Sequence, residues 1–183
     1  KDIYIILFLI FFIELFVHSK FRSLFIILIC LIATASILLQ IDRGAYIYFV
    51  LFFYFLYSII ARKYYDTLLI FFSLIVCWII AINFIGLDEF QAYLENTKAM
   101  AISGELIHGL KYPEPFFSIG DNPNGARATK ALLLQLTAGI FILNYLISNK
   151  NKIFSSKKVL FVFLFLLIFI MYKDALGRSD SAH

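Results

Sequence analysis

Apolar residues along this chain gather into six stretches separated by more polar connections. The stretches cover residues 3–17, 24–41, 45–60, 67–87, 131–147 and 159–172. A helix needs roughly 20 residues to cross the hydrocarbon core of a bilayer. The fourth stretch reaches that length, and the shorter ones would span with the help of flanking Lys, Arg and Tyr side chains. In none of them do apolar and polar residues alternate strictly, which is the pattern of barrel strands. The pattern therefore predicts an all-α bundle of about six transmembrane helices.

Charges in the connections predict the orientation of these helices. The first, third and fifth connections contain one acid, Asp66, and eight bases: Lys20, Arg22, Arg62, Lys63, Lys150, Lys152, Lys157 and Lys158. The second connection, QIDRG, is neutral, and the fourth, residues 88–130, has more acids than bases. Because Lys and Arg are enriched in cytoplasmic loops, the odd connections are expected in the cytoplasm. The second and fourth connections and the C-terminus then lie on the outer side.

This topology predicts an order of segments along the chain. Residues 1–87 form four transmembrane helices, 88–130 an outer loop of roughly 40 residues, 131–172 two further helices, and 173–183 the start of another outer segment. In the loop, Phe90, Tyr93 and Thr97 recur at helical spacing, which predicts a helix on the membrane surface. The turn-rich stretch KYPEPFFSIGDNPNGARATK follows, and a new helix is expected to begin near Ala126.

Composition supports a membrane protein and excludes other classes. The sequence is 62% hydrophobic with a mean hydropathy of +0.90, more apolar surface than a soluble domain can bury. The net charge of +4 does not predict nucleic-acid binding, because the bases lie between apolar runs without interleaved stacking residues. Cys30 and Cys77 lie inside apolar stretches, which favours small buried side chains over a disulfide or a metal site. The first residue is not Met, and we expect the chain to be a fragment of a longer protein.

Two places within the predicted bundle could carry chemistry. Glu14 lies at membrane depth, where an ionisable group is a functional candidate, although His18 four residues later would also pair with it. Asp42 and Arg43 stand beside Gly44 in the short QIDRG connection. They form either a tight turn with Asp42 as a helix cap, or an acid and an anion-binding base held rigidly at the outer mouth of the bundle.

The outer segments supply the other candidate residues. His108, with Glu105 three residues before it, fits a surface histidine better than a catalytic one. Arg127 and Lys130 flank the start of the fifth apolar stretch, where they would reach headgroups or bind a lipid-linked phosphate at a helix N-terminus.

The last residues, ALGRSDSAH, combine a base, an acid and a histidine. In a helical turn Asp180 and His183 would share one face. Asp180 could orient or deprotonate a hydroxyl, His183 could move protons near neutral pH, and Arg178 could bind phosphate. An ordinary turn that caps a following helix explains the same residues.

Four stretches together resemble one class of bacterial polytopic protein. They are IDRGAYIY at 41–48, ENTKAM with IHGLKYPEPFF across 95–117, ARATKALLL at 126–134 and ALGRSDSAH at 175–183. The combination is similar to inner-membrane proteins grouped with the GT-C-type glycosyltransferases, which use polyprenyl-phosphate sugars in cell-envelope polysaccharide biosynthesis. The resemblance covers most of the chain. The acidic general base that GT-C enzymes carry in their first outer loop has no counterpart here and is expected upstream of Lys1.

The resemblance implies transfer of a sugar from a polyprenyl-phosphate carrier to an envelope acceptor, a glycan or lipid, on the outer face. Asp180, His183 and Asp42 would then be catalytic. The residues that bind the substrate or the lipid phosphate would be Arg178, Arg43, Arg127, Lys130 and His108. No cofactor is expected, and a divalent metal stays open. Three alternatives are an O-antigen polymerase or ligase, a transporter or flippase of lipid-linked glycans, and a non-catalytic scaffold that would tolerate loss of the outer charges. The transporter requires ionisable residues near the midplane and broken helices, and neither is evident in the sequence.

Overall fold

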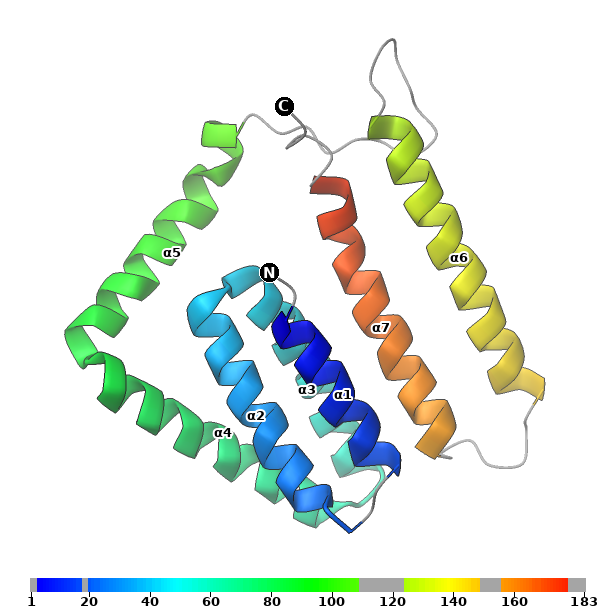
Figure 1. The fold of residues 1–183 in the computed structure, drawn as a ribbon, viewed down its shortest axis with the longest axis horizontal. Helices are drawn as coiled ribbons and strands as arrows, with labels where there is room; N and C mark the ends of the chain where they lie inside the picture. The colour runs from blue at the N-terminus through cyan, green and yellow to red at the C-terminus, as the bar shows by residue number, and fades with distance from the viewer. Residues whose placement is uncertain (1–2, 18–19, 109–123, 149–155, 178–183) are drawn as a thin grey trace. The chain divides into compact units, whose positions relative to one another are not determined.

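The described part of the chain is almost entirely helical. The computed structural model describes residues 3–17, 20–108, 124–148 and 156–177. Its helices are α1 (Ile3–Val17), α2 (Arg22–Leu39), α3 (Ile41–Ile60), α4 (Tyr64–Ile85), α5 (Leu87–His108), α6 (Asn124–Ser148) and α7 (Ser156–Gly177) (Figure 1). No strand occurs among the described residues. The predicted all-α fold class is confirmed.

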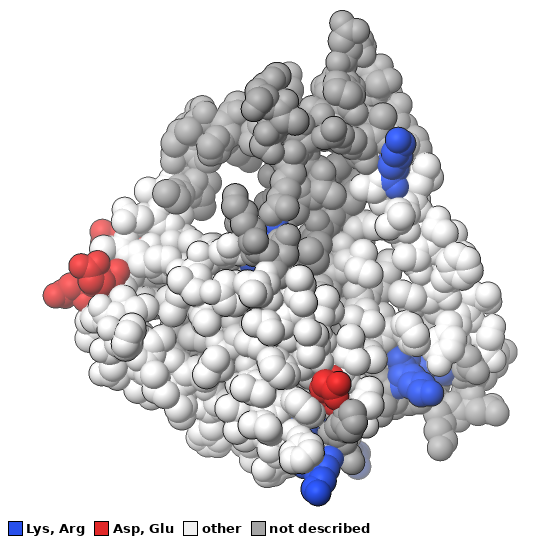
Figure 2. Space-filling view, viewed as in Figure 1, with Lys and Arg blue, Asp and Glu red and all other residues white. Residues whose placement is uncertain are grey.

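Four helix segments within the described residues are long and apolar enough to cross a membrane. They are Arg22–Leu39, Arg43–Ile60, Tyr64–Ile85 and Thr129–Ser148, while the apolar helix α1 has 15 residues. Large apolar side chains project outward from these helices, and Phe84 is 90% exposed. Figure 2 shows broad uncharged surface between the few charged side chains. Lipid is the solvent that suits such a surface, so the prediction of a membrane protein is confirmed. The count of six spans stays a prediction.

The helices belong to two compact units. Unit 1 consists of Lys1–Gly86 and Asn151–Leu167, and unit 2 of Leu87–Lys150 and Ile168–His183. Unit 1 has an aromatic core in which Phe12 of α1 contacts Tyr54 of α3 and Phe163 of α7, each pair with ring centroids 5.5 Å apart and edge-to-face. Edge-to-face pairs contribute beyond their buried area. They fix α1, α3 and the first part of α7 against one another.

Helices α2 and α3 form a hairpin joined by a single residue, Gln40. Its extended backbone, with φ −150° and ψ 88°, separates the two helices. Gly44 faces Ile37 so closely that a Cβ on Gly44 would overlap the backbone of Ile37. Small residues let helix backbones approach in this way within membranes. Ala33 and Ser36, the small buried side chains of α2 just before Ile37, leave room for this close approach.

This hairpin corrects the prediction that QIDRG is a connection. Helix α3 begins at Ile41, so Asp42 and Arg43 lie in its first turn rather than in a loop. The N-cap residue is Gln40, without a side-chain hydrogen bond, so Asp42 does not cap the helix. Sequence reasoning read Gly44 as a turn residue, whereas its function is to allow close contact between helices.

Unit 2 contains the segment predicted as the outer loop. Helix α5 covers most of its first half, as predicted, and Phe90 stacks on Tyr93 with centroids 6.4 Å apart. Helix α6 begins at Asn124, two residues before the predicted start. Gln135, buried in α6, donates a hydrogen bond of 2.8 Å to the carbonyl of Ile168 in α7. The position of α5 on the membrane surface stays a prediction.

Candidate functional site

A buried ion pair ties the start of α2 to the start of α4. Arg22 Nε lies 3.0 and 2.9 Å from the two carboxylate oxygens of Asp66, and its Nη2 lies 2.6 Å from Oδ2. The Arg22 side chain is 26% exposed and that of Asp66 only 6%. Several charge-assisted hydrogen bonds with this geometry are much stronger than a surface pair.

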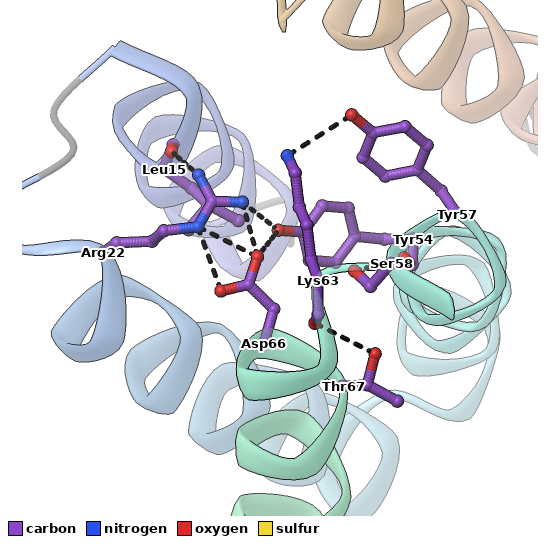
Figure 3. Close-up of polar contacts among 8 residues, drawn as sticks. All are labelled: Leu15, Arg22, Tyr54, Tyr57, Ser58, Lys63, Asp66 and Thr67. Carbon is purple, nitrogen blue, oxygen red and sulfur yellow. Dashed lines mark hydrogen bonds and ion pairs between the residues drawn. The ribbon is translucent and has the colours of Figure 1, made fainter. Parts of the chain in front are cut away.

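Two further helices complete this group, which we call the Arg22 cluster (Leu15, Arg22, Tyr54 and Asp66). Arg22 Nη2 donates to the Tyr54 hydroxyl at 2.8 Å, and Nη1 donates to the Leu15 carbonyl at 3.2 Å. The Tyr54 hydroxyl in turn donates to Asp66 Oδ2 at 3.3 Å. Figure 3 shows the guanidinium between these three partners. All four helices from α1 to α4 therefore meet at one polar point.

The turn between α3 and α4 presents Asp66 to this cluster. Arg62 has a positive φ of 54°, a conformation that non-glycine residues seldom adopt. Its amide donates to the Ile59 carbonyl at 3.0 Å, and that of Lys63 to Ser58 at 2.8 Å. Asp66 then falls in the first turn of α4, where the helix dipole favours an acid. Asp66, the one acid in the connections predicted to be cytoplasmic, is thus buried and pairs with Arg22, one of the bases of those connections.

The hydrogen bonds of the Arg22 cluster indicate a structural role. Each carboxylate oxygen accepts from Arg22, and Arg22 is held by three partners on three other helices. The two charged members of the cluster lie in the first turns of their helices, and in α1 to α4 every charged residue lies within four residues of a helix end. We therefore interpret the cluster as a fastening of the bundle rather than as a place where substrate reacts.

An apolar groove lies at the opposite end of the same helix pair. It has a volume of about 440 Å³. Its walls are the C-terminal halves of α2 and α4, and they include Leu31, Leu38, Cys77, Ala81 and Phe84. Thr34, the hydroxyl residue in the wall, donates to the Cys30 carbonyl at 3.0 Å and lies 3.2 Å from the Tyr48 hydroxyl. Its polar atom is thereby satisfied within the protein, and the groove offers a hydrocarbon surface.

The residues predicted to form the site fall into three groups. Arg178, Asp180 and His183 lie outside the described residues, as does His18, the predicted partner of Glu14. Asp42, His108 and Arg127 lie in helices α3, α5 and α6. The structure describes the side chains of the remaining two, Arg43 and Lys130.

Of those two, Arg43 is buried, with its guanidinium carbon 5.9 Å from the centre of the Tyr46 ring. Lys130 is exposed near the start of α6. Arg43 belongs to unit 1 and Lys130 to unit 2.

The Arg22 cluster itself was missed by sequence reasoning. Asp66 was visible as a lone acid among bases, but Arg22 is 44 residues away and no spacing rule pairs them. The cysteines agree with the sequence analysis, because Cys30 is buried, Cys77 is half-buried and neither forms a disulfide. Within the described part of the chain, no group of three or more His, Cys, Asp or Glu residues could hold a metal ion.

Comparisons with known proteins add no relative: no family model, curated protein or solved structure matches this chain. The resemblance to GT-C-type glycosyltransferases therefore rests on the sequence stretches quoted above.

Proposed function

We propose that this chain is part of an integral membrane glycosyltransferase of the GT-C type. It transfers a sugar from a polyprenyl-phosphate carrier to an acceptor on the outer face of the bacterial inner membrane. In this proposal residues 88–130 and the C-terminus lie on that outer face. The support comes from the quoted sequence stretches, from the membrane-spanning helices, and from one geometric observation, the apolar groove.

The groove carries the proposal because a lipid-linked donor needs a place for its hydrocarbon chain. The walls of the groove come from two candidate membrane spans and are apolar, and the volume of about 440 Å³ falls within the range of ligand pockets. In the predicted topology α2 and α4 both run from the cytoplasm outward. Their C-terminal halves, and the groove, then belong to the outer half of the membrane, where the proposed reaction occurs.

The transporter alternative fits the described helices less well. A transporter would place ionisable side chains near the middle of the bilayer. In α1 to α4 the charged residues lie near helix ends, and the Arg22–Asp66 pair joins two helix starts. This distribution favours an enzyme that acts at the membrane boundary over a path through the bundle.

A groove-filling variant tests the proposal. Ala81→Phe inserts a ring into the groove, and Val76→Phe adds the same ring to an exposed position of α4 outside it. Full-length protein reconstituted in vesicles would be assayed for sugar transfer from a polyprenyl-phosphate sugar. We expect Ala81→Phe to raise KM for the donor several-fold and Val76→Phe to leave it unchanged. Absence of transfer by the unchanged protein would overturn the proposed function.

A second assay addresses the outer residues. Arg178, Asp180 and His183 would each be changed to Ala in the full-length protein, and the envelope glycan would be measured in cells. Removal of one charge-stabilising or proton-transferring group costs on the order of 100-fold in rate. Wild-type glycan output from all three variants would show that these residues are not the site.

A further inference from the structure

Basic residues gather at the end of unit 1 where the Arg22 cluster lies. This basic end consists of Lys20, Arg22, Arg62, Lys63, Lys157 and Lys158. Glu14 and Asp66 are the acids of the same end, and Asp66 is occupied by Arg22. Lys20, Arg62 and Lys157 have exposed side chains. The surface of this end therefore carries an excess of positive charge.

The two turns that supply most of these bases are held side by side. Arg22 and Asp66 join them through the buried ion pair, and the hydroxyls of Ser23 and Tyr65 lie 3.3 Å apart. Lys63 donates to the Tyr57 hydroxyl at 3.3 Å, and its ammonium lies 5.0 Å from the centre of that ring. The backbone hydrogen bonds of Arg62 and Lys63 fix the turn itself. These contacts hold the backbone that carries the cationic side chains in one conformation.

The start of α7 belongs to the same end. Phe163 contacts both Tyr54 and Tyr57, which lie in the C-terminal part of α3. Helix α7 begins at Ser156, about two helical turns before Phe163. Figure 1 shows that α7 starts at the end of unit 1 where α1 and α3 finish. Lys157 therefore adds its charge to the other exposed bases.

Exposed aromatic rings accompany these bases. Phe21, Tyr64 and Tyr65 are 53%, 62% and 67% exposed and adjoin Lys20, Arg22 and Lys63 in the sequence. Tyr and other amphipathic rings concentrate at the level of lipid headgroups. Such rings next to exposed cations place the cations at the height of the phosphate groups, where each base is attracted by anionic lipid.

We propose that this basic end binds anionic phospholipid headgroups, with Lys20 and Arg62 as the main phosphate ligands. Arg62 offers a planar fork of N–H donors to phosphate oxygens, and Lys20 adds a compact charge from the adjoining turn. Lys63 and Lys157 contribute to the surrounding field. This site lies away from the apolar groove and does not depend on the proposed glycosyl transfer.

Lipid-binding measurements on matched charge variants test the inference. The full chain in detergent would be titrated with phosphatidylglycerol or phosphatidylcholine, and bound lipid counted by native mass spectrometry. Lys20→Gln/Arg62→Gln removes two charges from the basic end, and the control Lys98→Gln removes an exposed charge from unit 2. We expect roughly 10- to 30-fold weaker phosphatidylglycerol binding for the first variant and little change for the control.

Ionic strength gives a second measurement that needs no variant. Binding of phosphatidylglycerol to the unchanged protein should weaken strongly at 1 M salt, because the screening length falls to about 3 Å. Equal affinity for the two lipids, salt-independent binding, or a loss in Lys98→Gln as large as that in Lys20→Gln/Arg62→Gln would overturn the inference. None of these outcomes bears on glycosyl transfer, so the two proposals fail separately.

Discussion

Helices α2 and α4 are fastened at one end and separated by a groove at the other. At their N-terminal ends, Arg22 and Asp66 form a bidentate ion pair that Tyr54 and Leu15 complete. At their C-terminal ends the same helices line an open apolar groove of about 440 Å³. Polar groups in lipid have few alternative partners, so they specify one geometry. Apolar side chains contact lipid almost as favourably as they contact each other. The C-terminal ends of α2 and α4 can therefore bind a hydrocarbon chain between them.

Removal of the carboxylate should have the largest effect on this arrangement. Asp66→Ala leaves the Arg22 guanidinium without its ionic partner, and loss of one partner of a buried pair costs about 3 kcal/mol. We expect Tm in detergent to fall by roughly 5–10 °C. The double variant Arg22→Met/Asp66→Leu removes both charges and should unfold close to the wild-type temperature. An unchanged Tm for Asp66→Ala would mean that the ion pair does not fasten the helices.

The close contact between α2 and α3 should give the next largest effect. Gly44→Ala forces a Cβ into the backbone of Ile37, which neither helix can relieve by a rotamer change. Overpacking of this kind costs about 1–3 kcal/mol, and thermal unfolding would measure it. Ala45→Val alters the exposed neighbour of Gly44 and serves as the control. A Gly44→Ala protein as stable as wild type would show that the hairpin tolerates a wider separation.

The Tyr54 hydroxyl should contribute less than the ion pair. Tyr54→Phe keeps the buried ring but removes the group that accepts from Arg22 and donates to Asp66. We expect a loss of about 1 kcal/mol in the free energy of unfolding. Tyr65→Phe removes a hydroxyl that contacts Ser23 from an exposed position, and its effect should fall below about 0.5 kcal/mol. An equal loss of unfolding free energy in Tyr54→Phe and Tyr65→Phe would show that burial does not strengthen the hydrogen bonds of the Tyr54 hydroxyl.

A substitution at the groove end should affect stability least. Ala81→Phe enlarges a side chain that lines open apolar space, so the free energy of unfolding should change by less than about 0.5 kcal/mol. Thermal unfolding with Val76→Phe as the control would show it. A large loss of stability would mean that α2 and α4 close at this end in the folded protein, and the contrast between the two ends would disappear.

The sequence predicted the helices well because apolar stretches in a membrane protein have one stable backbone solution. The predicted stretch 3–17 has the same bounds as α1. The boundary before α3 was wrong because one extended residue, Gln40, suffices to separate two helices. The partner of Arg22 could not be predicted from sequence, since the choice of Asp66 depends on how α2 and α4 pack. The groove is equally a product of packing, because its lining residues resemble any other lipid-facing set.

The distance along the chain between Arg22 and Asp66 has a consequence for biosynthesis. Ribosomes add about 5–20 residues per second, so Asp66, 44 positions after Arg22, is made several seconds later. The α2–α3 hairpin, joined by Gln40, is complete at Ile60, before Asp66 is made, so the Arg22 guanidinium then lacks the carboxylate with which it pairs. Insertion of α4 supplies that carboxylate, so the last-made of these helices neutralises the charge that the hairpin carried into the membrane.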